Sequence, residues 1–390
     1  MQRPTRHGAT YVLYTWGDQS LIGREASEDH PADLPCPVLL HVGAEPSAST
    51  SSRTGAQIPG DGAAISTISL GGLGSTGRLG HGDERKYRDP TLVQSLHKQG
   101  IKAKSVVCGY FHSMVISSKG QVYTCGRGYK GFLGHKNQNN IRSFLLVDAL
   151  ASLKVTQVCA ARNHSLVVTS DGQVYSFGFP KHGRLGHGDD AYRRLPTMIE
   201  GLRGKKVVQT TCFGAHNAVL TDAGQVFMWG SGTDGKLGQG DNESHFAPVL
   251  VRALEGKGIK SIQCGYDFAA AINVEGHLFT WGHGLGGRLG HGDEENRTVP
   301  SLVTALAEVP IRAIACGAGH MAAISDMNVL YTWGKNAEGQ LGHGDRHDRH
   351  GPTVVATLLL APSEDAPPRG RVAKVSCGAN HTASLVSASP

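Results

Sequence analysis

The chain has 390 residues, of which 53 are glycine and 17 proline, and 39% of its residues are hydrophobic. Without a Gly-X-Y period, this composition excludes a collagen-like or wholly disordered chain. The formal net charge of +6 comes without the dense Lys/Arg stripe of a dedicated nucleic-acid-binding protein. No apolar run is long enough to span a membrane and no secretory signal opens the chain. We therefore expect an intracellular protein, cytoplasmic, nuclear or both, without a membrane partner.

The first 71 residues hold one strand-like phrase and one irregular segment. Residues 11–17 read as an aromatic strand that ends in Trp-Gly. Residues 18–71 lack the motifs that recur later and contain a Ser/Thr-rich tract. We interpret residues 18–71 as a degenerate repeat or a partly disordered insertion.

A repeat of about 52 residues occupies the rest of the chain. Its clearest mark is a Gly-Arg-Leu-Gly-His-Gly-Asp turn, preceded by an aromatic strand and a glycine. The leucines of this turn lie 52 to 54 residues apart, at Leu79, Leu133, Leu185, Leu237, Leu289 and Leu341. A second strand is built around a cysteine, usually with a histidine four or five residues later, at Cys108, Cys159, Cys212, Cys264, Cys316 and Cys377. Short β-branched segments and glycine turns predict about four strands per repeat.

The two ends of the chain carry complementary halves of one repeat. Residues 11–17 form an aromatic strand with no cysteine strand before it, and the last cysteine strand has no aromatic strand after it. We therefore predict an all-β, seven-bladed β-propeller, closed by pairing of the N- and C-terminal strands, with residues 1–390 as a single domain. Residues 358–371 are expected to form a loop insertion in the last repeat. A six-bladed ring with a long insertion is the alternative.

Several motifs imitate catalytic or nucleotide-binding sites. Residues 230–236 resemble a phosphate-binding loop, but Leu237 replaces the required Ser or Thr and no helix follows. We interpret the recurring glycines as turn residues with positive φ, and the His and Asp residues of the repeated turns as Asx-type turn stabilisers. The histidines after the cysteines are expected to be buried and hydrogen-bonded. The sequence thus predicts no covalent catalytic site, cofactor, metal or small-molecule substrate.

The repeat resembles that of the regulator of chromosome condensation family, with its Cys-Gly-x-x-His strand, aromatic-Trp-Gly strand and Leu-Gly-x-Gly turn. The resemblance implies a seven-bladed propeller that recognises proteins; in the founding member it promotes nucleotide exchange on the small GTPase Ran. Other members are scaffolds, parts of ubiquitin ligases or a plant ultraviolet-B photoreceptor. That photoreceptor carries tryptophan after the cysteine, whereas this chain has Gly109-Tyr110-Phe111-His112 and similar phrases. The tryptophans here are expected to pack between blades, so light sensing is disfavoured, and the short N-terminal arm disfavours chromatin binding.

Functional residues are sought where the repeats differ from one another. Equivalent loops of a propeller gather on one face around its axis, so the loop before each Leu-Gly turn is a candidate partner-binding element. The predicted partner-binding residues are Tyr129, Lys130, Lys181, His182, Asp234 and Glu338. The first four would form a basic-aromatic sector suited to an acidic protein surface. A second candidate surface comprises Arg85, Lys86, Tyr87 and Arg88 with Tyr192, Arg193 and Arg194. Ordinary solvated loops are the alternative for both.

Taken together, these features predict a protein-interaction propeller. The first hypothesis is a guanine-nucleotide exchange factor for a Ran-like small GTPase, which would act by binding the nucleotide-free GTPase more tightly than the nucleotide-bound form. The alternative is a non-catalytic scaffold or a substrate-recognition module, for example in ubiquitin ligation. A conventional enzyme is disfavoured because every catalytic-looking pair recurs around the ring.

Overall fold

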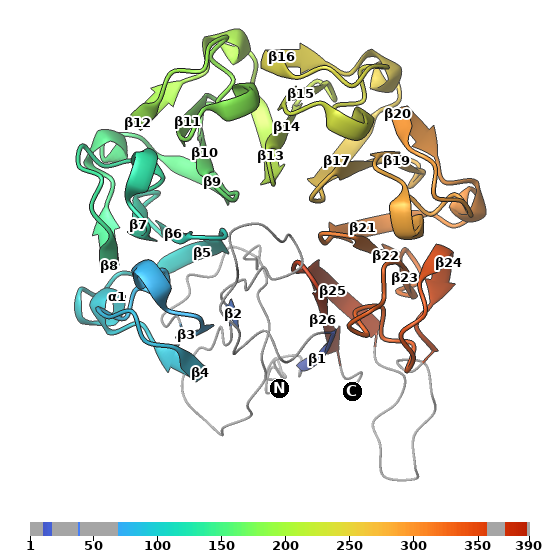
Figure 1. Ribbon diagram of the computed structural model, residues 1–390, viewed down its shortest axis with the longest axis horizontal. Helices are drawn as coiled ribbons and strands as arrows, with labels where there is room; N and C mark the ends of the chain where they lie inside the picture. Colours follow the sequence, from blue (N-terminus) through green and yellow to red (C-terminus); the bar gives the residue numbers. More distant parts are fainter. Residues whose placement is uncertain (1–10, 18–37, 40–68, 357–370, 388–390) are drawn as a thin grey trace, which may run out of the picture.

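Seven antiparallel sheets surround a central axis in the computed structural model, which describes residues 11–17, 38–39, 69–356 and 371–387 (Figure 1). Five of these sheets have four described strands and two have three. In each complete sheet, or blade, the first strand in sequence lies nearest the axis and the fourth lies at the rim (Figure 1). This arrangement confirms the predicted all-β propeller with four-stranded repeats.

The complete blades are built from strands of five to seven residues. Their first and second strands are β5 (Ala103–Cys108) and β6 (His112–Ser117), β9 (Val155–Ala160) and β10 (His164–Thr169), β13 (Val207–Phe213) and β14 (His216–Thr221), β17 (Ile259–Cys264) and β18 (Phe268–Asn273), and β21 (Ile311–Cys316) and β22 (His320–Ser325). Their third and fourth strands are β7 (Val122–Gly126) and β8 (Ile141–Leu146), β11 (Val174–Gly178) and β12 (Arg193–Met198), β15 (Val226–Gly230) and β16 (His245–Leu250), β19 (Leu278–Gly282) and β20 (Arg297–Leu302), and β23 (Leu330–Gly334) and β24 (Arg349–Val354).

Short helical turns connect these strands. One set follows the third strands: η2 (Ser75–Gly77), η3 (Tyr129–Gly131), η5 (Lys181–Gly183), η7 (Thr233–Gly235) and η9 (Leu285–Gly287). A second set follows the fourth strands: α1 (Gln94–Lys98), η4 (Asp148–Leu150), η6 (Glu200–Leu202), η8 (Arg252–Leu254) and η10 (Thr304–Leu306). None of the helices in the described ranges is long and apolar enough to cross a membrane.

The ring is closed by strands from both ends of the chain. β1 (Tyr11–Gly17) pairs antiparallel with β26 (His381–Ser387), which pairs with β25 (Arg371–Cys377). The predicted closure is therefore confirmed, and it pairs edges that an open sheet would expose.

The remaining sheet contains the start of the regular repeats. It consists of β2 (Val38–Leu39), β3 (Ser69–Gly72) and β4 (Tyr87–Leu92). Of the segment interpreted as a degenerate repeat or insertion, residues 18–37 and 40–68 lie outside the described residues. The same holds for residues 357–370 of the loop insertion expected in the last repeat.

Burial of both faces explains why the central residues of the second strand are apolar in every complete blade. Every residue of β6, β10, β14, β18 and β22 is buried, because each blade is covered on both sides by its neighbours. Trp229, Trp281 and Trp333 have no exposed surface, and each indole Nε1–H donates a hydrogen bond of 3.1–3.2 Å to a backbone carbonyl of the preceding blade. The predicted packing of tryptophan between blades is thus confirmed for these three; the Trp16 side chain lies outside the described residues.

The strand histidines also join neighbouring blades. Nε2 of His112 lies 2.8 Å from Ser165 Oγ, and Nε2 of His320 lies 2.9 Å from Thr382 Oγ1. His164 makes the equivalent contact with the side chain of Asn217. These side chains are fully buried, which confirms the prediction and lowers the pKa of His112 to about 4 and those of His164 and His320 to about 3.

His216 departs from this pattern. It is equally buried, but Ala269 stands in the next blade where Ser165, Asn217 and Thr382 stand elsewhere, so no hydroxyl or amide side chain faces its ring. Burial lowers the pKa of His216 to about 3. The predicted side-chain hydrogen bond of the strand histidine is therefore not formed by His216, because the next repeat has Ala269 at the partner position.

The repeated turns use glycine for two different reasons. Gly126 and Gly131 have φ of +119° and +82°, as predicted for turn glycines. Gly128, between them, has φ of −85°, so the prediction of positive φ is wrong for this position. A Cβ on Gly128 would lie 1.8 Å from the carbonyl oxygen of Asn139, so glycine is required there by the close approach of two backbone segments.

The acidic residues of the repeated turns behave as predicted. The carboxylates of Asp83, Asp189, Asp293 and Asp345 each accept the backbone N–H two residues later at 2.9–3.1 Å, which is the Asx-turn geometry. The histidines of these turns bond elsewhere, since His291 and His343 each contact a threonine hydroxyl of the third strand at 3.0 Å.

Candidate protein-binding site

Two loops from every complete blade meet at one end of the ring, which we call the loop face. It comprises the loops between first and second strands and the turns that follow the third strands. Backbone hydrogen bonds hold each pair of loops together, as when the N–H of Arg127 donates to Phe111 O at 3.0 Å and that of Phe179 to Asn163 O at 2.9 Å. Residues far apart in the sequence thus become neighbours on this face.

Lys130 is the centre of an aromatic cluster on the loop face. It lies in η3, and its Nζ is 4.9 Å from the ring centroid of Tyr129, 4.1 Å from that of Phe179 and 5.8 Å from that of Tyr192. The last two rings belong to the next blade, so the ammonium group bridges two blades. Such contacts are cation–π interactions, in which the negative faces of the rings attract the cation. Tyr129 and Tyr192 remain about half exposed, at 47% and 49%.

A second group of rings and cations extends the cluster. The Arg127 guanidinium lies 5.0 Å from the Phe111 ring centroid and 5.2 Å from that of Tyr129. Arg162 lies 5.3 Å from the ring of Tyr110, which packs edge-on against Phe111 at 4.2 Å. We call the combined surface the cation–aromatic sector; it consists of Tyr110, Phe111, Arg127, Tyr129, Lys130, Arg162, Phe179 and Tyr192.

Lys181 and His182, in η5, border this sector. Both are exposed. The carbonyl of Lys181 accepts a hydrogen bond of 2.8 Å from Nε of Arg184, whose guanidinium lies 5.4 Å from the Phe179 ring. Partial burial, followed by the charges of Arg184 and Lys181, lowers the pKa of His182, so this side chain is neutral at physiological pH.

Asp234 and Glu338 lie on other blades and are not part of the sector. Asp234 is half-buried in η7, where its Oδ1 accepts a hydrogen bond of 3.2 Å from Asn296. Glu338 follows β23 and is also half-buried. Lys236, two residues after Asp234, is buried, and its ammonium forms an ion pair of 2.6 Å with Asp267 of the next blade. The six predicted residues therefore divide into a basic-aromatic group and two carboxylates elsewhere on the ring.

Two cations of the second surface predicted from the sequence are paired with neighbouring carboxylates. Arg85 pairs with Asp83 at 2.7 Å and Arg193 pairs with Asp189 at 2.7 Å. Of the other residues, Lys86 and Arg194 are exposed, the hydroxyl of Tyr87 donates to Asp83, Tyr192 joins the cation–aromatic sector, and the side chain of Arg88 lies outside the described residues.

The turns of the loop face share an unusual backbone conformation. Their central residues Thr76, Lys130, His182 and Asp234 have φ between +57° and +63°, a left-handed conformation that favours glycine. Gly286 occupies the same position in η9, with φ of +75°. Non-glycine residues in this region are often retained for function at a cost in stability. Lys130 is thus placed beneath the three rings by a strained turn.

Five of the eight residues of the sector were not predicted from the sequence. Tyr110, Phe111 and Arg162 lie in the loop between first and second strands, which the repeat pattern assigns only to the cysteine motif. Arg127 and Phe179 stand directly after the third strand. The available signal was weaker than for Lys130, because Tyr266 and Lys335 stand at the positions of Tyr110 and Arg127 in other repeats.

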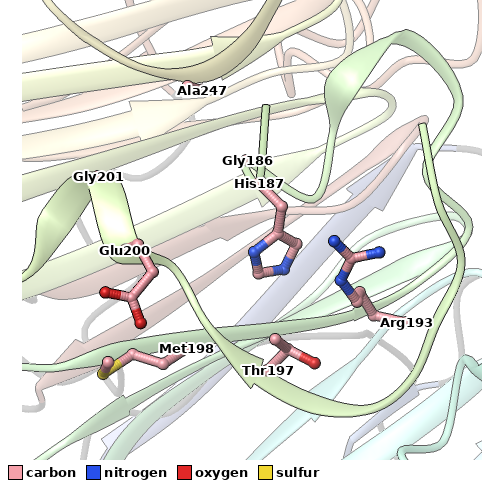
Figure 2. A pocket seen from close by; sticks show the side chains of 8 residues that line it. All are labelled: Gly186, His187, Arg193, Thr197, Met198, Glu200, Gly201 and Ala247. Carbon is pink, nitrogen blue, oxygen red and sulfur yellow. The ribbon is translucent and has the colours of Figure 1, made fainter. Parts of the chain in front are cut away.

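A shallow depression on the flank of one blade is a separate feature. Its volume is about 310 Å³, and Figure 2 shows the side chains of His187, Arg193 and Glu200 around it. Nε2 of His187 lies 2.9 Å from Ser176 Oγ, a contact that recurs between threonine and histidine in three other blades. Burial and the nearby Arg193 lower the pKa of His187 to about 4. We assign no ligand to this depression because its central histidine has a repeated structural role.

Two further features of the described part of the chain concern the metal and phosphate-loop motifs. No group of three or more His, Cys, Asp or Glu side chains there is arranged to hold a metal ion. The lysine of the phosphate-loop-like segment, Lys236, is used by Asp267. What the loop face offers is a surface of exposed rings and cations.

A closed ring of blades built from one repeated sequence unit defines a β-propeller. The chain belongs to the regulator of chromosome condensation (RCC1) repeat family, as the resemblance predicted. The family's repeat matches residues 70–116, 119–168, 171–220, 223–272, 275–324 and 328–385.

Two relatives illustrate the range of proteins that carry this domain. The chain is 35% identical over 321 residues to the human E3 ubiquitin-protein ligase HERC2, a match that covers 82% of this chain and 6% of the ligase. It therefore spans a small part of that relative. It is 33% identical over 312 residues to the ultraviolet-B receptor UVR8 of Arabidopsis thaliana, a match that covers 80% of this chain and 68% of the receptor.

Solved structures share the fold at lower sequence identity. Human WBSCR16 superposes with a TM-score of 0.73 at 24% identity, covering 97% of this chain and 99% of that one. Prp20p from Saccharomyces cerevisiae superposes with a TM-score of 0.74 at 18% identity, covering 97% and 92%. Prp20p is described as having binding properties to Gsp1p and histones.

Proposed function

We propose that this propeller binds an acidic surface of a protein partner through the cation–aromatic sector, and that it acts as a guanine-nucleotide exchange factor for a Ran-like small GTPase. The observation that carries the proposal is the partly exposed cluster around Lys130, in which Tyr129 and Tyr192 are the exposed rings. Among the described residues, Arg127, Lys130, Arg162 and Lys181 form no ion pair with an acidic side chain. These cations are therefore available to carboxylates of a partner.

The chemistry of the sector favours a protein over other ligands. Tyrosine and arginine are enriched among the residues that dominate binding energy at protein interfaces, because they combine area with polar or charged ends. The rings also shield the cations from water on one side, which strengthens their attraction to an incoming carboxylate. Complementary charge would in addition speed association.

Nucleotide exchange requires no covalent chemistry from the propeller. A partner that binds the nucleotide-free GTPase more tightly than the GDP-bound form accelerates GDP release by that difference in affinity. Prp20p, which shares the fold, is described as having binding properties to Gsp1p. This likeness supports the choice of small GTPases as the first partners to test.

The test is release of fluorescent GDP from a panel of small GTPases, Ran included, with micromolar propeller. We expect one member to release GDP faster, and we expect the charge reversal Lys130→Glu with Lys181→Glu to abolish the acceleration. Lys335→Glu is the matched control, because Lys335 is a cation of the loop face on a distant blade. If no GTPase responds, the exchange activity is refuted.

The second candidate is a non-catalytic scaffold or substrate-recognition module. The match to a short part of a ubiquitin ligase supports it, since such a module can stand within a much longer protein. In this case a partner would bind with an affinity that falls on Lys130→Glu and Lys181→Glu, while GDP release from every GTPase stays at its basal rate. The two candidates are thus separated by one pair of measurements.

A further inference from the structure

Four lysines gather at the end of the ring opposite the loop face, which we call the hairpin face. It comprises the hairpins between second and third strands and the beginnings of the first strands. The N–H of Ser118 donates to Lys102 O at 2.7 Å, and the N–H of Val155 donates to Gly120 O at 2.9 Å. These bonds place the β6–β7 hairpin, with Lys119 at its tip, between the starts of β5 and β9.

The lysines come from these three segments. Lys102 and Lys104 stand at the start of β5, Lys119 at the hairpin tip and Lys154 directly before β9; all four are exposed. The Lys154 side chain runs along the hairpin, because its Cγ would lie only 2.9 Å from a Cβ placed on Gly120. None of the four forms an ion pair with an acidic side chain among the described residues. We call Lys102, Lys104, Lys119 and Lys154 the lysine cluster.

The cluster departs from the pattern of the other complete blades. Their hairpins each carry a carboxylate, at Asp171, Asp222, Glu275 and Asp326, whereas the β6–β7 hairpin carries none. The Asp171 hairpin adjoins Lys154, because the N–H of Ser170 donates to Lys154 O at 2.8 Å, but Asp171 and Lys154 form no ion pair. Asp222, by contrast, lies 3.7 Å from the ammonium of Lys206. Among the complete blades, Lys119 is the only lysine in such a hairpin, and it stands where two of the other hairpins have Asp171 and Glu275. The four lysines therefore concentrate positive charge at one place on the hairpin face, whereas acidic and basic side chains are mixed on the rest of it.

We propose that the lysine cluster binds a soluble, compact polyphosphate, of the class of inositol polyphosphates or inorganic polyphosphate. Like charges held together repel, and a multivalent anion removes that repulsion. Lysine ammonium groups suit phosphate as mobile point charges with three donors each. Convergence of three segments on one point suits a compact anion with several phosphates.

Other polyanions fit the surface less well. A nucleic-acid duplex needs a track of cations, and here Asp171 and Asp222 interrupt the charge on the adjacent blades. Single strands are usually held by exposed aromatic rings, and the segments that carry the lysine cluster have no large exposed hydrophobic side chain. The same lack disfavours a membrane surface, where apolar side chains insert beside the cations.

Calorimetric titration with inositol hexakisphosphate at about 0.15 M salt tests the proposal. We expect micromolar affinity for the wild-type propeller and an affinity at least about tenfold weaker for Lys119→Gln with Lys154→Gln. Lys206→Gln and Lys260→Gln form the control, because both are exposed lysines of the same face whose ammonium groups already have partners, Asp222 at 3.7 Å and the Val274 carbonyl at 3.5 Å. The control variants should bind within about twofold of the wild type.

Three results would overturn the proposal. The first is no binding by the wild type while thermal melting shows it folded. The second is an equal loss in the control variants, which would mean diffuse attraction to the whole face. The third is tighter binding to a duplex RNA or to vesicles containing phosphoinositide than to the soluble anion. The cluster lies on the face opposite the cation–aromatic sector, so failure here leaves the protein-binding proposal unaffected, and the reverse also holds.

Discussion

The contacts between neighbouring blades repeat around the ring, whereas those on the loop face do not. Between blades, the same contacts recur with small variations: an indole donates to a carbonyl, and a histidine meets a hydroxyl or amide. On the loop face, the rings and cations around Lys130 occur in two neighbouring blades and are not repeated in the others. Positions that are alike in all repeats therefore build the ring, whereas positions that differ among the repeats form the candidate binding site.

Acidification should produce the largest effect, because it acts on four blade interfaces together. The folded-state pKa values of His112, His164, His216 and His320 are about 3 to 4, below the unfolded value near 6.5. Their contribution to stability is complete above pH 6.5 and is lost as the pH falls toward 4, since the unfolded chain then binds more protons. At pH 5 the loss is about 2 kcal/mol for each histidine. Urea denaturation at pH 7.5 and pH 5 measures it; equal stability at both values would contradict the buried neutral histidines.

Removing one indole should be the largest single-residue effect. Trp281→Ala would leave a cavity and an unpaired Lys236 carbonyl, and we expect a loss of about 3–5 kcal/mol in the free energy of unfolding. Trp281→Phe keeps most of the packing and should cost less. The measurement is chemical denaturation of both variants; a loss below about 1 kcal/mol for the alanine variant would show that the blade interface repacks.

The histidine contacts allow a matched pair of opposite changes. Ser165→Ala removes the partner of His112 Nε2 and should destabilise the propeller by about 1–3 kcal/mol. Ala269→Ser restores the repeat's hydroxyl opposite His216 and should stabilise it by about 1 kcal/mol. Thermal melts of the two variants check the signs. Destabilisation by Ala269→Ser would mean that the site has no room for the hydroxyl.

The fold could be predicted because the sequence motifs that determine it recur in every regular repeat. Leucine turns, cysteine strands and the complementary chain ends recur at a fixed period, so the closure by β1 and β26 followed from the sequence. The sequence did not reveal why glycine is needed at position 128, because the close approach of Asn139 O to its backbone depends on a turn eleven residues away. His216 was misread because its missing partner belongs to the next repeat.

Fewer than half of the residues of the candidate site could be predicted, for a related reason. Lys130 and Tyr129 stood out because they are absent from the equivalent loops. Their contact with Phe179 joins two blades, and that of Arg127 with Phe111 joins two loops of one blade. Such neighbours are set by the curvature of the ring, which a repeat period does not specify.

The substitution Lys130→Gly tests most directly whether the Lys130 side chain serves partner binding and not the stability of the fold. Gly286 shows that glycine fits this turn position, and the backbone N–H that donates to Gln138 is retained. Relief of the left-handed conformation offsets the lost cation–π contacts, so we expect a change in stability within about 1 kcal/mol. The stimulated GDP-release rate, or the affinity for a captured partner, should fall about tenfold or more. Unchanged binding by a folded Lys130→Gly variant would contradict the account.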